Sequence, residues 1–406
     1  MRLDGRKYVI LVGDGMGDYP QDELDGRSPL EGAATPHMDL IASRGILGWA
    51  QTVPADCEPG SDIANLSLLG YDPLIYHTGR APFEAISLGL RLQERDVAFR
   101  CNLIHLEHQE QGLVKMGSYS AGHISTEEGR LLITDLNEFL KGPDLAFYPG
   151  VSYRQILIWR GADPSIRTIP PHDLTGQDVT SLLDPEGESK EIVTLIRRSW
   201  PFLEKHPVNQ VRQEKGQITA NSIWLWGQGK SPSMPSFRER FGLRGGVISA
   251  VDLLKGIGLA AGLKPIFVPG ITGYLDTNFR GKAEKALDFL EGNDLVFVHV
   301  EAPDEASHEG NLEKKIQAIE FFDREVVGTM MEGLKRFESW SLLVVTDHFT
   351  PVQVMTHTRE PVPLAVLRSE DESRKIRKRG FGERSAYEGE VAFLKGDQIM
   401  PWFLGR

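Results

Sequence analysis

Three short apolar runs constrain the fold of this chain more than any other feature. They cover residues 8–12, 295–300 and 342–346, and each is nearly continuous and rich in β-branched side chains. Strands that are buried on both faces of a parallel sheet have this composition. Residues 312–337, between the second and third runs, carry apolar side chains at helical spacing. A strand, a helix and a strand in this order predict a βαβ crossover and therefore an α/β fold.

The length of the chain predicts more than one domain. A single hydrophobic core stops growing near ~250–300 residues, and this chain has 406. Its middle part is richer in Gly, Pro and His, and the apolar runs there are shorter. We therefore expect a core domain built from residues 1–76 and 240–406, with a smaller α/β domain inserted at 77–239.

Two further segments are predicted from local composition. Residues 266–268 are apolar and follow a helix-like stretch at 251–263, so we expect a fourth strand there. Residues 227–235, with the sequence GQGKSPSMP, have the composition of a linker that returns to the core domain.

Charge and cysteine content exclude several classes of protein. The net charge of -12 argues against a nucleic-acid partner, which would need a basic face. The two cysteines fit neither a zinc pattern nor a disulfide scaffold, and this favours a reducing, cytoplasmic location. No apolar run approaches the length of a membrane span, so we expect no membrane partner. Composition leaves a monomer and a homo-oligomer equally open.

Acidic and histidine side chains follow each of the three predicted strands. Asp14 comes after the first run, Asp304 and His308 after the second, and Asp347 and His348 after the third. Ligands of open α/β sheets bind outside the carboxyl ends of the strands, so these side chains are expected to converge. A single Asp at such a place is often only a helix cap or a turn residue. Three strand ends with acids together favour a metal site.

The number of these side chains is enough for two metal ions. His357, ten residues after Asp347, is a sixth candidate ligand. Asp and His are ligands for Mn²⁺, Zn²⁺, Co²⁺ or Mg²⁺, with Mn²⁺ our first expectation. Two metal ions a few ångströms apart clamp the attacking and leaving oxygens of a phosphoryl transfer. The pattern therefore predicts two divalent metal ions and phosphoryl-transfer chemistry.

A candidate nucleophile, Ser61, lies in the segment EPGSDIANL at residues 58–66, which has the pattern of a loop that enters a helix. Serine is a favoured helix cap, so a purely structural role is one interpretation. The alternative is catalytic, because a helix N-terminus stabilises an alkoxide or a phosphate. A bound metal would also lower the pKa of the hydroxyl. The local sequence leaves both interpretations open.

Eight segments spread over almost the whole chain carry a family resemblance. They are GDGMGD (13–18), EPGSDIANLSLLGYDP (58–73), HTGRAPFEA (77–85), SAGHIST (120–126), PPHDLTG (170–176), GGVISAVDLLKGIGLAAGL (245–263), VEAPDEASHEG (300–310) and TDHFTP (346–351). In this order they closely resemble the archaeal-type cofactor-independent phosphoglycerate mutases of the alkaline phosphatase superfamily. The resemblance implies a mostly parallel sheet sandwiched by helices, with a smaller inserted domain that closes over the substrate.

The same resemblance implies a role for each candidate residue. One metal ion would be held by Asp14, Ser61, Asp347 and His348, and the other by Asp304, His308 and His357. Ser61 would take the phosphate from one hydroxyl of phosphoglycerate and return it to the other, without bisphosphoglycerate. The partner is thus a small phosphorylated substrate. His123 and Arg154 match substrate-binding positions of the inserted domain, and Arg80 and Lys282 are further candidates, since Arg and Lys suit phosphate and carboxylate groups.

Three positions depart from the family pattern close to the proposed ligands. Ser307 and Thr346 stand where Gly is expected, and Phe349 stands where a small hydroxyl residue is usual. They leave open a change of substrate. A metal-dependent phosphatase or phosphodiesterase, a phosphopentomutase and a binding protein without activity are therefore the alternatives to a phosphoglycerate mutase.

Overall fold

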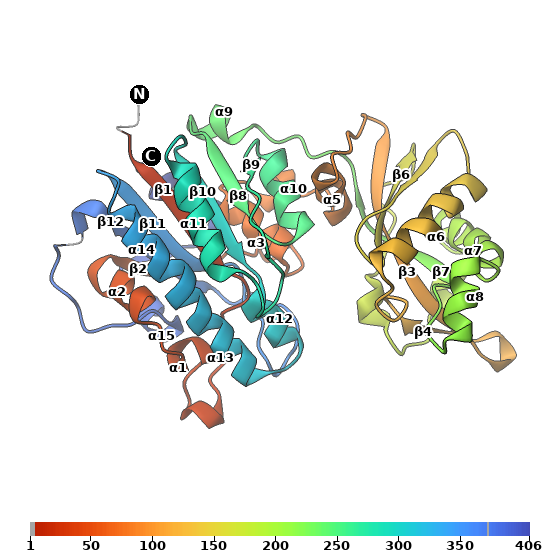
Figure 1. Ribbon diagram of the computed structural model, residues 1–406, viewed down its shortest axis with the longest axis horizontal. Coiled ribbons are helices and arrows are strands. Elements are labelled where there is room, and N and C mark those ends of the chain that lie inside the picture. Colours follow the sequence, from red (N-terminus) through yellow and green to blue (C-terminus); the bar gives the residue numbers. More distant parts are fainter. Residues whose placement is uncertain (1–4, 372) are drawn as a thin grey trace. The chain divides into compact units, whose positions relative to one another are not determined.

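The computed structural model describes residues 5–371 and 373–406 and divides the chain into two compact units (Figure 1). Unit 1 comprises residues 1–77 and 233–406, and unit 2 comprises residues 78–232. Among the helices of the described residues, none is long and apolar enough to cross a membrane.

Unit 1 is built on an eight-stranded mixed sheet with the order β13-β2-β12-β11-β1-β10-β8-β9. The strands are β1 (Lys7–Gly13), β2 (Ile46–Ala50), β8 (Gly245–Ile248), β9 (Lys264–Pro265), β10 (Leu295–Val300), β11 (Trp340–Thr346), β12 (Val362–Arg368) and β13 (Val391–Phe393). The three apolar runs are confirmed as β1, β10 and β11, which are parallel neighbours. Gly13 lies opposite Val300 and Thr346, so the three strands end level at one edge of the sheet.

Helices cover both faces of this sheet. They are α1 (Pro29–Gly32), α2 (Pro36–Arg44), α3 (Ser61–Leu68), α4 (Pro73–Tyr76), α9 (Phe237–Phe241), α10 (Asp252–Ala260), α11 (Phe279–Leu290), α12 (Ala302–His308), α13 (Leu312–Phe321), α14 (Gly328–Leu334), α15 (Glu383–Tyr387) and α16 (Ile399–Phe403). Val9 and Leu11 of β1 pack in one core with α2, α11, α13 and α14. Tyr8 points to the other face, where its ring meets Phe403 of α16. The helix-flanked α/β architecture expected from the sequence is thus confirmed.

The predicted crossover helix is present but not uniform. It runs as α13, a π-helical segment (Phe322–Val327) and α14 between β10 and β11. The segment buries Asp323, whose carboxylate accepts hydrogen bonds from the backbone N–H groups of His37 and Met38 in α2.

Two local predictions were wrong. Residues 266–268 are not a strand, because the pairing with β8 ends at Pro265 and Phe267 is 82% exposed. The last hydrogen bond to β8 runs from Ile266 N to Val247 O, at 2.9 Å. The linker does not begin at residue 227, because β7 (Ser222–Gly229) continues to Gly229, which pairs with Ala98.

Unit 2 contains a five-stranded antiparallel sheet with β3 at its centre. The strands are β3 (Asp96–His108), β4 (Val114–Ser118), β5 (Leu145–Tyr148), β6 (Arg154–Arg160) and β7 (Ser222–Gly229). The helices are α5 (Arg80–Ser87), α6 (Thr126–Phe139), α7 (Lys190–Leu203) and α8 (Pro207–Glu214). The long strand β3 pairs with β4, β6 and β7. The unit has its own apolar core, in which β3 and β7 pack against α6 and α7.

Candidate active site

The first cluster of candidate metal ligands lies where β1 and β11 end. Asp14 follows β1 directly, and Asp347 and His348 follow β11. His348 Nε2 lies 3.3 Å from Asp14 Oδ1 and 3.6 Å from Asp347 Oδ2, and all three side chains are buried. One ligand atom from each residue lies within 4.8 Å of the others. The level ends of the two strands account for this convergence.

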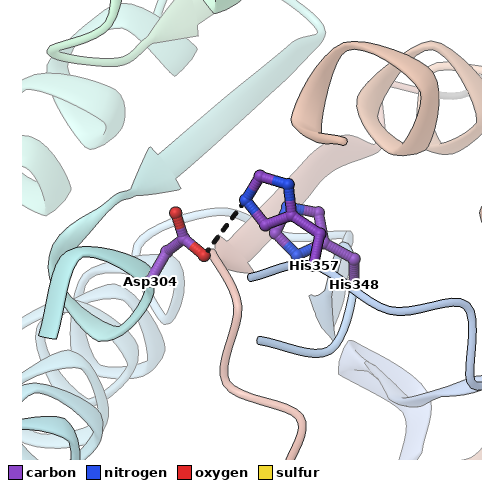
Figure 2. Close-up of side chains that lie close together, drawn as sticks. All are labelled: Asp304, His348 and His357. Atoms are coloured by element: carbon purple, nitrogen blue, oxygen red, sulfur yellow. Dashed lines mark ion pairs between the residues drawn. The ribbon is translucent and has the colours of Figure 1, made fainter. Parts of the chain in front are cut away.

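A second cluster shares His348 and adds Asp304 and His357. Figure 2 shows Asp304, from α12, pointing toward His357 and His348, which come from the segment after β11. His357 Nε2 lies 3.5 Å from Asp304 Oδ1. His308, one helical turn after Asp304, places its Nε2 atom 3.1 Å from Asp304 Oδ2 and 3.1 Å from His357 Nε2. The structure therefore brings these four candidate residues together.

Hydrogen bonds fix the orientation of two of these histidine rings. Thr350 donates its only hydroxyl proton to Asp304 Oδ1, at 2.5 Å, so it can only accept from His348 Nδ1, at 3.1 Å. His308 Nδ1 donates to the carbonyl of Met355 at 2.9 Å. A neutral ring that donates from Nδ1 keeps its lone pair on Nε2. The Nε2 atoms of His348 and His308 thus face Asp14 and Asp304, and they are the atoms with which these rings could bind a metal ion.

Ser61 lies beside the first cluster. It is the first residue of α3, and its Oγ atom is 3.1 Å from His348 Nε2. Asn65, one turn later, donates one amide N–H group to Ser61 O and another to Asp347 Oδ2, both at 2.8 Å. The helix therefore ties the position of Ser61 to that of a candidate metal ligand.

The charges of the two clusters suit cations. Burial, followed by repulsion from Asp347 and Asp304, raises the pKa of Asp14 well above its usual range. Within the described part of the chain, Asp14 Oδ1 is buried and has no hydrogen-bond partner. An unpartnered buried carboxylate oxygen is costly unless a cation meets it. The donor set of carboxylates and imidazoles therefore fits divalent metal ions.

The histidines of the clusters differ in charge. Burial lowers the pKa of His348 to about 4, so this ring is neutral. Burial would also lower the pKa of His308, but the hydrogen bond and the charge of Asp304 outweigh it and raise the pKa to about 9. Asp304 has its pKa held well below the usual range, because His357 and His308 outweigh the effect of burial. A metal ion at Asp304 would thus displace a proton from His308.

Unit 2 holds three of the predicted substrate residues, and aromatic rings connect them. His123 and Arg154 both lie beside Tyr153. The ring centroids of His123 and Tyr153 are 6.2 Å apart, and the guanidinium of Arg154 is 5.7 Å from the centroid of the Tyr153 ring. Arg80 lies 5.8 Å from the ring of Trp226. Tyr119 and His172 bridge the two groups through edge-to-face ring contacts.

A second arginine, Arg100, adds to this basic and aromatic cluster. Its guanidinium lies 4.2 Å from the ring of Trp226 and pairs with Glu84. Arg80, Arg100 and Arg154 carry three positive charges, against the negative charges of Glu84, which pairs with Arg100, and of Asp173, which lies 3.7 Å from His172. The cluster can therefore attract an anion.

The hypothesis that Lys282 contacts the substrate needs correction. Lys282 is completely buried in α11, and its ammonium group donates to Glu301 Oε2 at 2.6 Å and to His299 O at 2.8 Å. A side chain enclosed in this way does not reach a molecule in solvent. Lys282 instead supports the strand that leads to Asp304.

The three departures from the family pattern support the loops around the clusters. Ser307 donates to Pro303 O within α12. Thr346 accepts from Met16 N and donates to His348 O. Phe349 is buried and contacts Gly17, where even a Cβ atom would overlap with its ring.

Sequence reasoning missed Asn65, His299 and Thr350, which contact the clusters, and Glu301, which contacts His299. The one available signal was His299, a titratable side chain inside the otherwise apolar run 295–300. The others become visible only when their partners from distant segments are in place.

Comparison with known proteins gives the same family by two routes. The sequence model of a family described as 2,3-bisphosphoglycerate-independent phosphoglycerate mutase matches residues 42–209. A protein from Geobacter sulfurreducens, named as a probable member, is 49% identical over 98% of this chain and 100% of its own length. The chain belongs to the 2,3-bisphosphoglycerate-independent phosphoglycerate mutase family. A member from the archaeon Methanosarcina barkeri is 49% identical over 97% of this chain and 98% of its own.

Solved structures agree with this family. A protein from Pyrococcus horikoshii has a TM-score of 0.80 and 30% identity, covering 98% of this chain and 97% of the other. The cofactor-independent phosphoglycerate mutase of Thermoplasma acidophilum has a TM-score of 0.63 and 26% identity, covering 98% and 99%. The family resemblance found in the sequence, and the α/β fold that it implies, are therefore confirmed.

Proposed function

We propose that this chain is an isomerase that interconverts 3-phosphoglycerate and 2-phosphoglycerate through a phosphoserine at Ser61. Membership of the mutase family, at 49% identity over nearly the whole chain, supports the overall reaction. The observation that supports the nucleophile is the 3.1 Å contact between Ser61 Oγ and His348 Nε2 at the start of α3.

The two half-reactions follow from this arrangement. A bond forms between Ser61 Oγ and phosphorus, while the bond from phosphorus to one glycerate oxygen breaks. The hydroxyl proton of Ser61 ends on the released glycerate hydroxyl. The second half-reaction is the reverse at the neighbouring hydroxyl. Atoms and charge balance without water or bisphosphoglycerate, and the N–H groups at the start of α3 favour the phosphate.

The two clusters are proposed to hold two divalent metal ions. Asp14, Asp347, His348 and Ser61 would hold one, and Asp304, His308 and His357 the other. Bound divalent ions would supply positive charge that favours the serine alkoxide and the transferring phosphoryl group. Carboxylate and imidazole ligands accept Mn²⁺, which we propose as the working metal, and also Zn²⁺, Co²⁺ or Mg²⁺.

Unit 2 is proposed to bind the substrate. His123, Arg154 and Arg80, together with Arg100, form a basic and aromatic cluster that suits a phosphate or carboxylate group. In this proposal the unit also excludes water, because water would hydrolyse the phosphoserine and release phosphate.

A coupled assay tests the function. 3-Phosphoglycerate and Mn²⁺ are supplied without bisphosphoglycerate, and 2-phosphoglycerate is followed through enolase while free phosphate is measured in parallel. The variants are Ser61→Ala and, as a matched control, Ser43→Ala, a buried serine of α2 that donates to Leu40 O. We expect fast product formation in the wild type and in Ser43→Ala, and none in Ser61→Ala.

Three other results of this assay would contradict part or all of the proposed function. Release of phosphate without 2-phosphoglycerate would identify a hydrolase on the same core. Full activity of Ser61→Ala would remove the serine from the mechanism while leaving the mutase reaction intact. The absence of both products would rule out phosphoglycerate as the substrate.

A further inference from the structure

A row of three charged or titratable side chains is buried directly behind the first metal cluster. Lys282 comes from α11, His299 from β10 and Glu301 from the residue after β10. Their exposed fractions are 0%, 0% and 1%. We call these three residues the buried row. None of them carries a role in the function proposed above.

Glu301 is held from two sides. Its Oε2 atom accepts from Lys282 Nζ at 2.6 Å. Its Oε1 atom accepts from Ser249 Oγ at 2.6 Å and from Ala250 N at 2.7 Å. Both carboxylate oxygens are therefore fixed, one by α11 and the other by the two residues that follow β8, and the carboxylate has no freedom to turn.

His299 connects this fixed carboxylate to the candidate metal ligands. Its Nδ1 atom lies 3.4 Å from Glu301 Oε1, while Nε2 lies 3.4 Å from Asp14 Oδ2 and 3.6 Å from Asp347 Oδ2. One edge of the ring faces Glu301 and the other faces the two aspartates. Asp14 Oδ2 thus faces His299, while the other oxygen, Oδ1, faces His348.

We propose that the buried row positions Asp14 and Asp347 for metal binding, with Glu301 orienting His299 and Lys282 orienting Glu301. The inference rests on the proposed metal centre and adds three positioning residues to it. Burying a lysine and a glutamate costs free energy, and proteins in which apolar residues of similar size replace such a pair are often no less stable. Partners behind metal ligands typically change metal affinity 10–100-fold when they are removed. The placement of the row, behind two carboxylates that would share one ion, fits that role.

Metal affinity, measured without substrate, tests the inference. Mn²⁺ binding is titrated by calorimetry in the wild type, Glu301→Gln, His299→Gln and Asp323→Asn, and the visible spectrum of the Co²⁺ forms is recorded. Asp323→Asn is the matched control, since Asp323 is an equally buried carboxylate of unit 1 whose hydrogen bonds go to α2. The unfolding temperature of each metal-free variant reports any general damage to the fold.

We expect Glu301→Gln and His299→Gln to bind Mn²⁺ about 10–100-fold more weakly and to show altered Co²⁺ spectra. Asp323→Asn should keep its affinity even where its unfolding temperature falls. If His299→Gln does not fold, the metal affinity of Glu301→Gln alone tests the inference. This variant should fold, because its amide has the shape of the carboxylate and can still accept a hydrogen bond from Ala250 N.

Two results would overturn the inference, and they can be told apart. Affinities of Glu301→Gln and His299→Gln equal to that of the wild type would show that the row is only structural, and the proposed metal centre would stand. A wild-type protein that binds no Mn²⁺, Zn²⁺, Co²⁺ or Mg²⁺ would remove the metal centre and the inference together.

Discussion

Gly15 lies between Asp347 and Asp304, which belong to the two clusters of candidate metal ligands, and it offers a sharp test of their geometry. It has φ of +61°, and a Cβ atom there would lie 2.6 Å from both Asp304 Oδ1 and Thr350 Oγ1. Ordinary contact begins near ~3.5 Å, so Gly15→Ala must displace the Asp304 carboxylate or the loop by roughly 0.9 Å. The positive φ adds about 1–2 kcal/mol of backbone strain.

The control for Gly15→Ala is Gly26→Ala. Gly26 has φ of +73°, and no atom of the described residues would lie within 4 Å of its added Cβ. Both variants should lose about 1–2 kcal/mol of unfolding free energy from the backbone alone. Only Gly15→Ala should also lose activity, by about 100-fold, because a displacement near 1 Å in a catalytic site has that effect.

Urea unfolding of the metal-free proteins, calorimetric titration of Mn²⁺ and the coupled assay measure the three quantities separately. The expected pattern is a stability loss in both variants that is larger in Gly15→Ala, because its Cβ atom also overlaps Asp304 and Thr350, with weaker metal binding and low activity in Gly15→Ala alone. Equal activities and metal affinities in the two variants would refute the assignment of Asp304 to a metal site, since its carboxylate would then tolerate displacement.

Three further predictions concern two titratable side chains and the proposed metal ions. Burial raises the pKa of Glu383 from 4.5 to about 7, so the unfolding free energy of the wild type falls by up to about 3 kcal/mol as pH rises from 4.5 to 7. Glu383→Gln does not titrate, so its stability relative to the wild type should increase over this pH range and stay constant above it. A difference that is the same at all pH values would contradict this. Lys282→Met leaves Glu301 without its cation and should cost about 3–5 kcal/mol in urea unfolding, whereas Lys282→Met/Glu301→Gln should cost less; equal losses would argue against a charge effect. Prolonged dialysis against EDTA should abolish mutase activity, and Mn²⁺ should restore it; activity that survives the dialysis would exclude the two-metal mechanism.

Much of unit 1 was predictable because its signals are local. The continuous apolar runs of β1, β10 and β11 identify buried parallel strands wherever they occur in a fold. Parallel strands end at one edge, so Asp14, Asp304 and Asp347 could be expected to meet without any knowledge of the loops. Ser61 at a helix start was likewise visible from its own segment. The roles of these residues in catalysis remain predictions.

The wrong predictions share a physical cause. Phe267 is apolar, but the last residue of β9 that pairs with β8 is Pro265, and composition alone does not show where a ladder ends. Gly227 suggests a linker, but β7 continues through it because β3 supplies a pairing partner. In both cases a partner strand elsewhere in the sequence decided the local structure.

The sequence by itself determined the α/β class of the core, the strand ends that carry the acids, and the family. Only the tertiary structure decided that Lys282 faces Glu301 rather than the substrate, and that His299 links Glu301 to Asp14. The reason is that burial and pairing of a charge depend on atoms from several elements at once. A helix position such as Lys282 looks the same in sequence whether its ammonium group meets solvent or a carboxylate of the core.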